Sequence, residues 1–266
     1  MSHELRIGRQ PLALAALAVS CALLGVPSAS PVRAADAPPS TSRISHEDAT
    51  FTIWQGDRKL GTEEILVYSS HDTLVTASTT HLELRDTTAA GGTFPYEKRT
   101  TFLQRLFDSY PLLFQSMESE RGDTASTRSL NCLFRDTTAV VYTERAGKGQ
   151  GDAVALPPGR LYILDQGVYL QVEILAADFA TRQQQVRKQY VLIPARHRIA
   201  EVELRRGPSE RMTFEGKEVE TVKVEISDAT TLLRAWIAPD GRMLKLEAPS
   251  ARLRVERGPE RASAQP

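Results

Sequence analysis

Histidine is the first residue type to examine for chemistry, because its side chain moves protons and binds metals near neutral pH. Downstream of residue 34 the sequence has four histidines, His46, His71, His81 and His197. No two of them stand as His-x-His or His-x-x-x-His, the spacings that place two metal ligands on one element. The sequence therefore predicts no metal site, and nothing else in it predicts a cofactor.

Cysteine offers a second kind of chemistry, and the chain has Cys21 and Cys132. Cys21 lies inside an apolar leader run; the alternative is a lipoprotein cut before Cys21, although Ala18 stands where such sites usually have leucine. Once the leader is removed, Cys132 has no partner for an intramolecular disulfide. Its neighbours form a strand-like run with no adjacent histidine or cation to lower its pKa, so we expect a buried, unreactive thiol.

Motifs of the common enzyme classes are missing from the sequence. It has no Gly-x-Ser-x-Gly elbow, no Walker-type phosphate loop and no dinucleotide-binding glycine fingerprint. Gly147, Gly149 and Gly151 surround Lys148, but this segment opens no helix, so we expect a flexible loop. A carboxylate pair for glycoside hydrolysis stays open, because the sequence alone places no two of them across a cleft. We predict no catalytic residue and a protein that is not an enzyme.

Aromatic residues make up 6% of the chain and provide side chains suited to an apolar ligand. Most of them fall on apolar faces of the expected elements. Core packing is one interpretation of these residues, and lining a cavity for a lipid-sized ligand is the other. The candidate cavity lining comprises Phe51, Trp54, Phe114, Tyr169, Val172, Phe179 and Trp236.

Alternation of apolar and polar residues dominates residues 49–256. Val222, Val224 and Ile226, for example, alternate with charged residues. Such alternation predicts strands with one buried and one wet face, as in an antiparallel sheet. The Asp-Gly step at residues 240–241 predicts a hairpin turn. We expect about ten or eleven strands.

One or two short helices interrupt this pattern. Apolar residues at helical spacing predict a helix over residues 166–178, with Asp165 as the residue that caps its start. A second helix, if present, falls near residues 102–107. Strongly twisted sheets of this size curl. The predicted fold is therefore mainly β, a large curved antiparallel sheet that forms an incompletely closed half-barrel, with a two-sheet β-sandwich as the alternative.

Residues 1–34 have the order of a cleavable secretory signal peptide. Arg6 and Arg9 precede an apolar run over residues 12–26, and small residues lead to a cleavage site before Ala35. The run is shorter than the ~20 residues that span a bilayer as a helix. We therefore expect a periplasmic or extracytoplasmic protein with no transmembrane span after cleavage. An uncleaved anchor is the alternative.

The remaining chain divides into three parts by composition. Residues 35–48 are expected to be a flexible Pro/Ser-rich lead-in, residues 49–256 a single β-rich domain, and residues 257–266 a disordered tail. Without residues 1–34 the chain holds 30 basic and 32 acidic residues. A balanced charge of this kind offers no basic footprint for nucleic acid, so we expect no nucleic-acid partner.

Two segments resemble those of a known group of proteins. Residues 51–63 resemble its opening strand, turn and entry to a second strand, and residues 236–247 resemble its closing hairpin. The group is a set of uncharacterised, exported bacterial β-rich proteins, whose long curved sheet is similar to the half-barrel of the Lol lipoprotein carriers. The resemblance implies this fold over residues 49–256, a cell-envelope location, and at most a hydrophobic ligand or envelope component in the sheet's concavity. It implies no active residues.

Three hypotheses for the function follow from the sequence. The first is an exported, non-enzymatic protein that binds a lipid, another hydrophobic ligand or an envelope component in the concave face of its sheet. The second is an envelope structural or assembly factor that binds a protein partner through a sheet edge or the concavity. The third is an unrecognised hydrolase, which a cleft with two or three convergent polar side chains would favour.

Overall fold

The structure is a computed structural model that describes residues 45–70, 72–85, 92–105, 108–120, 127–182 and 184–259. The described residues all belong to one compact unit. The signal peptide, Cys21, the lead-in up to residue 44 and the tail from residue 260 lie outside the described residues. These assignments therefore stay predictions.

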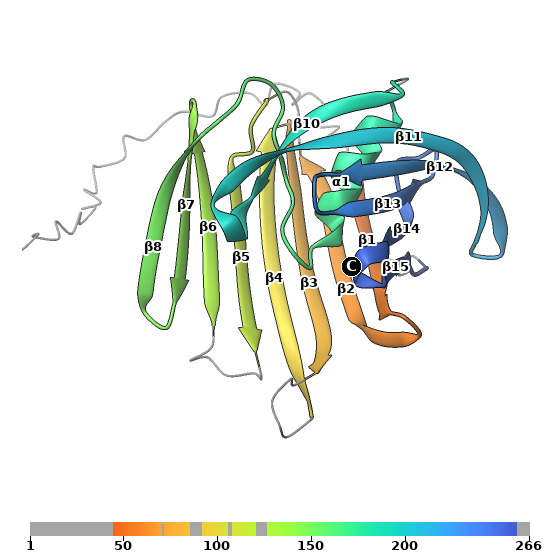
Figure 1. Cartoon of the computed structure of the whole chain (residues 1–266), viewed down its shortest axis with the longest axis horizontal. Helices are drawn as coiled ribbons and strands as arrows, with labels where there is room; N and C mark the ends of the chain where they lie inside the picture. Colours follow the sequence, from red (N-terminus) through yellow and green to blue (C-terminus); the bar gives the residue numbers. More distant parts are fainter. Residues whose placement is uncertain are drawn as a thin grey trace, which may run out of the picture. The chain divides into compact units, whose positions relative to one another are not determined.

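The strands of the described chain form one fifteen-stranded sheet (Figure 1). Their order is β8-β7-β6-β5-β4-β3-β2-β1-β15-β14-β13-β12-β11-β10-β9, and every neighbouring pair is antiparallel except β9 with β10. The strands are β1 (Ser45–Gln55), β2 (Arg58–Ser70), β3 (Thr73–Arg85), β4 (Thr93–Arg105), β5 (Leu113–Glu120), β6 (Arg128–Arg135), β7 (Thr138–Arg145), β8 (Lys148–Ala155), β9 (Tyr162–Ile163), β10 (Val186–Ile193), β11 (Arg198–Phe214), β12 (Lys217–Ser227), β13 (Leu232–Ile237), β14 (Met243–Ala248) and β15 (Leu253–Arg257).

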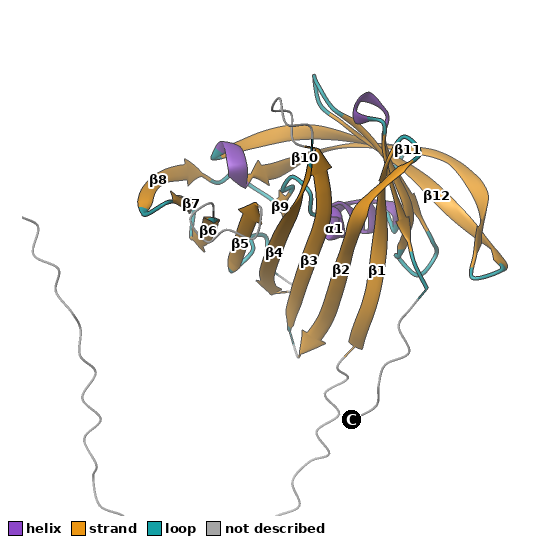
Figure 2. Ribbon diagram, turned by 90° about the horizontal axis from the view of Figure 1, so that it is seen from below, coloured by secondary structure: helices purple, strands orange, loops and turns teal. Residues whose placement is uncertain are grey.

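The sheet has two arms that meet where β1 pairs with β15. Strands β1 to β8 follow one another in one direction, and strands β15 to β9 extend in the other. Figure 2 shows that the sheet curves around the helix α1, while β8 and β9, its two ends, are not bonded to each other. The predicted large, incompletely closed curved sheet is therefore confirmed, and the two-sheet sandwich is wrong.

Apolar side chains gather in two clusters on the inner face, which is the face that curves around α1. The first cluster packs α1 onto β1, β2 and strands β10 to β15. The second crosses the gap between the two arms, because Leu161, Ile163 and Leu192 from one side pack against core residues of β4 to β7 such as Phe114 and Val141. Side chains, rather than a ladder of backbone hydrogen bonds, hold the free ends of the arms together.

The helix α1 spans Tyr169–Ala180 and begins three residues later than the predicted start. Asp165 was predicted to cap it, but the Asp165 carboxylate pairs with Lys98 instead. Glu63 of β2 accepts a hydrogen bond from the N–H of Tyr169 at 2.9 Å. A residue 106 positions earlier in the chain thus serves the helix start, which no local pattern reveals. Within the described ranges, no helix is long and apolar enough to cross a membrane.

Two further local predictions are wrong. Residues 102–105 belong to β4, so no helix forms there. The glycine-rich segment that was expected to be a flexible loop is a hairpin, with a turn at residues 146–147 followed by β8. A Cβ at Gly149 would stand 1.8 Å from the hydroxyl oxygen of Tyr142. Glycine is needed there because the ring of the neighbouring strand lies across β8.

Gly61 marks a close approach of β2 to β3, since a Cβ there would stand 1.8 Å from the carbonyl oxygen of His81. Backbone cannot swing aside as a side-chain tip can, so the strands would have to separate. We expect Gly61→Ala to lower the free energy of unfolding by about 2 kcal/mol, measured by urea denaturation. Gly92→Ala is the control, because its Cβ would meet nothing within 4 Å. Equal losses in the two variants would contradict the close approach.

Candidate functional site

The predicted cavity-lining residues divide between the two faces of the sheet. Phe51, Val172 and Phe179 meet in the first cluster, and Tyr169 packs against it. Phe114 lies in the second cluster, across the gap. Phe51, Phe114 and Phe179 are 0% exposed. These five positions therefore contribute to a packed interior that α1 occupies.

The two tryptophans of the predicted set lie on the outer face and do not reach the interior. The Trp54 ring centre lies 5.4 Å from the guanidinium carbon of Arg254, and the Trp236 ring centre lies 4.7 Å from Lys245 Nζ. The Trp236 Nε1–H also donates to Glu210 at 2.7 Å. Strand alternation explains this placement, because the residue before each tryptophan belongs to the first cluster.

A buried polar cluster lies on the inner face where the segment between β9 and α1 crosses β2, β3 and β4. Lys98 Nζ stands 2.5 Å from Asp165 Oδ2, and both side chains are at most 2% exposed. The ammonium also donates to the carbonyl oxygen of Gln166 at 2.9 Å, and the Thr80 hydroxyl donates to that of Gly167 at 3.0 Å. These bonds hold Asp165, Gln166 and Gly167, the three residues before Val168, the N-cap of the helix.

Glu63 belongs to the same cross-strand row, opposite Thr80, which is in turn opposite Lys98. Its Oε2 accepts the Tyr169 N–H, and its Oε1 is buried as well. Burial raises the pKa of the Glu63 carboxyl to about 7, against the lowering effect of the Tyr169 N–H. The folded protein therefore keeps a proton on Glu63 to a higher pH than an exposed glutamate does.

A second buried ion pair holds the middle of α1. Arg257 of β15 lies 2.9 Å from the Glu173 carboxylate and also contacts Glu47. Its guanidinium carbon stands 5.2 Å from the centre of the Phe51 ring. Burial raises the pKa of Glu173 to about 8, against the lowering effect of a backbone hydrogen bond with Met243. The buried charges at both places thus attach the helix to the sheet.

Metal and thiol chemistry find no support in the described part of the chain. No group of three or more His, Cys, Asp or Glu side chains there is placed to hold a metal ion. Cys132 is buried, as predicted, and burial raises the pKa of its thiol to about 12. The thiolate needed for nucleophilic attack is therefore scarce at neutral pH.

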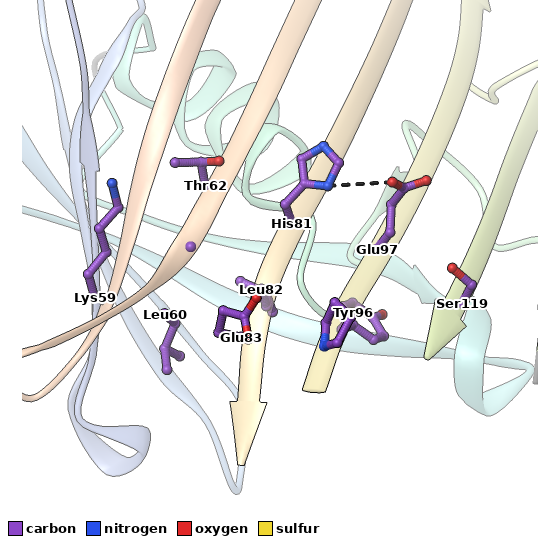
Figure 3. Close-up of a pocket in the computed structure, with 11 residues that line it drawn as sticks. Lys59, Leu60, Thr62, His81, Leu82, Glu83, Tyr96, Glu97 and Ser119 are labelled. Atoms are coloured by element: carbon purple, nitrogen blue, oxygen red, sulfur yellow. Dashed lines mark ion pairs between the residues drawn. The ribbon is translucent and has the colours of Figure 1, made fainter. Parts of the chain in front are cut away.

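A shallow pocket of about 460 Å³ lies at strands β2 to β5 (Figure 3). Figure 3 shows His81 and Glu97 on neighbouring strands with their side chains toward each other, and His81 Nδ1 lies 3.5 Å from Glu97 Oε2. Leu60, Leu82 and Tyr96 line the pocket as well. Because the ion pair is exposed, it contributes little stability. We assign no reaction to this pocket.

The outer face of strands β2 to β8 carries two neighbouring cross-strand rows without a charged side chain. We call these two rows the outer band. The first row is apolar throughout, and the second mixes apolar, small and uncharged polar side chains. The first comprises Tyr68, Val75, Leu103, Leu113, Leu133, Val140 and Ala153, and the second comprises Leu66, Ala77, Thr101, Gln115, Asn131, Tyr142 and Gly151.

The large apolar side chains of the outer band are most exposed on β6 and β7. Leu133 is 45% exposed, Val140 42% and Tyr142 40%. Charged residues return in the adjacent rows, as at Arg99 and Arg105. An exposed apolar patch with a polar rim is typical of an interaction surface.

The outer face of the other arm carries many charged side chains, beside the exposed apolar residues Val186 and Tyr190 of β10. Oppositely charged side chains pair across strands β10 to β15, as in Lys188 with Glu201 at 2.7 Å and Arg234 with Glu225 at 3.2 Å. Such exposed pairs add little stability, but they keep a surface hydrated. Charged residues are 25% of the sequence, so the uncharged outer band departs from the composition of the chain.

Sequence reasoning missed both the polar cluster and the outer band. The sequence did contain a sign of Glu63 and Lys98. Glu63 stands two residues before Ile65, and Lys98 stands four before Phe102, so strand alternation puts each charged residue on the same buried face as these core residues. The sign of the outer band in the sequence is weaker, because its two rows can be identified only when the register of all seven strands is known.

Comparisons with known proteins show the fold and leave the activity open. No family model matches the sequence, and no curated protein matches it. A solved structure, a beta-barrel-like protein of a domain of unknown function, DUF1849, from Brucella abortus, matches with a TM-score of 0.58 and 10% identity. The match covers 83% of this chain and 99% of that chain. It supports the predicted likeness to uncharacterised β-rich proteins; the likeness to the Lol carriers and the export stay predictions.

The raised pKa of Glu63 makes the stability depend on pH. The folded protein holds this proton more tightly than the unfolded chain, so the free energy of unfolding falls as pH rises from about 4.5 to about 7. Glu63→Gln keeps an oxygen for the Tyr169 N–H and removes the charge. Between pH 5 and pH 8 we expect the free energy of unfolding of this variant to fall by about 2 kcal/mol less than that of the unchanged protein, measured by urea denaturation.

The control is Glu83→Gln, which removes an exposed carboxylate from the neighbouring strand. This variant should keep the pH dependence of the unchanged protein. A Glu63→Gln variant with that same pH dependence would show that Glu63 is charged in the folded state throughout this range.

Proposed function

We propose that this protein is exported to the bacterial cell envelope and binds a protein partner through the outer band. The export rests on the signal-peptide pattern of residues 1–34. The binding rests on one observation, the uncharged and partly exposed band over seven strands that continue one sheet.

The side chains of the outer band favour a protein over other partners. Thr101, Gln115 and Asn131 offer uncharged donors and acceptors, which suit the amide groups of a protein and would be left unpaired against acyl chains. The band has no cation to meet the phosphates of a nucleic acid or a lipid headgroup. Seven strands at a spacing of about 4.8 Å make it roughly 30 Å long, the scale of a standard protein interface.

A hydrophobic ligand in the concave face, the first hypothesis from the sequence, has weaker support. The helix α1 occupies that face, held by Glu63 at its start and by Arg257 at its middle. A ligand would have to displace the helix and break these buried contacts, each of which is costly to open.

The test is site-specific photo-crosslinking in cells that export the protein. A benzophenone amino acid replaces Leu133 in the outer band, or, as the matched control, Val186 of β10, which is 48% exposed. We expect a crosslinked protein adduct at position 133 and none at position 186. Val140→Glu should reduce the adduct at least about tenfold, because a charge in an apolar contact is left unpaired.

Three results would overturn the proposal. Equal crosslinking at positions 133 and 186 would make the outer band an ordinary surface. If Val140→Glu leaves the adduct unchanged, the crosslinked protein touches position 133 without binding specifically to the apolar surface of the outer band. A lipid in place of a protein in the adduct would replace the proposed partner class and return the first hypothesis to favour.

A further inference from the structure

A hydroxyl, an imidazole and a carboxylate form a chain of two hydrogen bonds where the free ends of the two arms approach each other. Thr143 Oγ1 lies 2.7 Å from His197 Nε2, and His197 Nδ1 lies 2.5 Å from Asp152 Oδ2. Thr143 belongs to β7 and Asp152 to β8, whereas His197 follows the short 3₁₀ helix η2 (Pro194–Arg196) between β10 and β11. The three residues come together only through the tertiary fold.

The register of the strands and the backbone of one turn place these groups. Asp152 is opposite Val141, a buried inner-face residue, so Asp152 and Thr143 point to that same inner face. His197 has a φ of 48°, and its N–H donates to the carbonyl oxygen of Pro194 at 2.9 Å. A left-handed conformation is uncommon outside glycine. Here it carries the imidazole to the strands of the opposite arm.

The hydrogen bonds fix the tautomer that base catalysis needs. The Asp152 carboxylate can only accept, so the proton of a neutral imidazole sits on His197 Nδ1. His197 Nε2 is then an acceptor, and the Thr143 hydroxyl donates to it. A hydroxyl that points its proton at an imidazole oriented by a carboxylate is the arrangement of a nucleophile, a general base and an orienting group.

A pocket of about 570 Å³ opens beside this triad. Thr143 and His197 line it together with three exposed cationic side chains, Arg145, Lys148 and Arg196. None of these three cations has an ion-pair partner among the described residues. Unpaired cations at the mouth of a pocket attract anionic groups and stabilise negative charge that develops on an oxygen.

We propose that Thr143, His197 and Asp152 form a hydrolytic site for esters that carry an anionic group. Thr143 is the nucleophile, His197 the general base, and Asp152 the positioning residue. The site lies on the face of β7 opposite the outer band, so this activity is independent of the proposed partner binding.

The reaction balances with water as the only co-substrate. Thr143 Oγ1 attacks the ester carbonyl while its proton moves to His197 Nε2. The bond from the carbonyl carbon to the leaving oxygen breaks, and that oxygen takes the proton from His197. Water then attacks the acyl-threonine with His197 again as base, releasing the carboxylic acid and restoring the hydroxyl.

The experiment measures hydrolysis and covalent labelling of the purified full chain. The substrates are p-nitrophenyl acetate, which is neutral, and the p-nitrophenyl monoester of succinate, which is anionic. A fluorophosphonate probe reports the nucleophile. We expect faster hydrolysis of the anionic ester, an adduct on Thr143 by peptide mass spectrometry, and a loss of at least about 100-fold in Thr143→Val and His197→Gln. Thr143→Ser should keep the activity.

Control variants separate catalysis from a merely structural role of the contact. Thr138→Val, on the same strand but the other face, and His81→Gln should keep full activity and labelling. Arg145→Gln should reduce hydrolysis of the anionic ester more strongly than hydrolysis of the neutral ester. No adduct on Thr143, or unchanged hydrolysis in Thr143→Val, would overturn the proposal. A lower melting temperature of the variants without any loss of hydrolysis would make the triad only a bridge between the arms.

Discussion

The buried ion pair of Lys98 with Asp165 is the interaction on which the rest of the structure depends. A fifteen-stranded sheet with two unbonded ends keeps its curve only if other contacts hold it. The ion pair anchors the segment that crosses from the end of one arm to the start of α1, and the carbonyl of Gln166 supplies the ammonium with a further acceptor. Such a pair is costly to desolvate and costlier to break, because the remaining charge would stay buried. Both core clusters need the crossing segment and the helix in these places.

Because α1 fills the concave face of the sheet, the surfaces that remain for binding a partner or substrate lie elsewhere on the sheet. The inner face is committed to α1 and to the contact between the arms, while the outer face carries ion pairs on one arm and the uncharged outer band on the other. Both arms follow the same strand alternation, but the outward positions of β10 to β15 include ion pairs such as Lys188 with Glu201, and those of β6 and β7 include exposed apolar residues such as Leu133 and Val140. The proposed partner surface and the proposed hydrolytic site therefore lie on opposite faces of β7.

The sequence predicted what local periodicity controls and missed what the register controls. Alternation in segments such as Val222 to Ile226 was enough for the strands and the curved sheet, and apolar spacing located α1 to within three residues. The face of Trp54 and Trp236 required the parity of each strand relative to the core. The contact of Glu63 with the helix start, and the line of Thr143, His197 and Asp152, join residues that are 45 to 106 positions apart. No window of the sequence contains such pairs, so no local pattern could predict them.

The pairing of β1 with β15, which joins the two arms, has a consequence for how the protein folds. Nearly all strands pair with their neighbours in sequence, so each arm can grow by successive hairpins. The pairing of residues 51–55 with residues 253–257 instead closes a loop of about 200 residues. Contacts between residues so far apart in the sequence form slowly, so we expect β15 to pair with β1 late in folding. Until then the edge of β1 that pairs with β15 has unpaired backbone groups, which can bond to a wrong strand or to another chain. A chaperone that binds this edge would prevent such pairing.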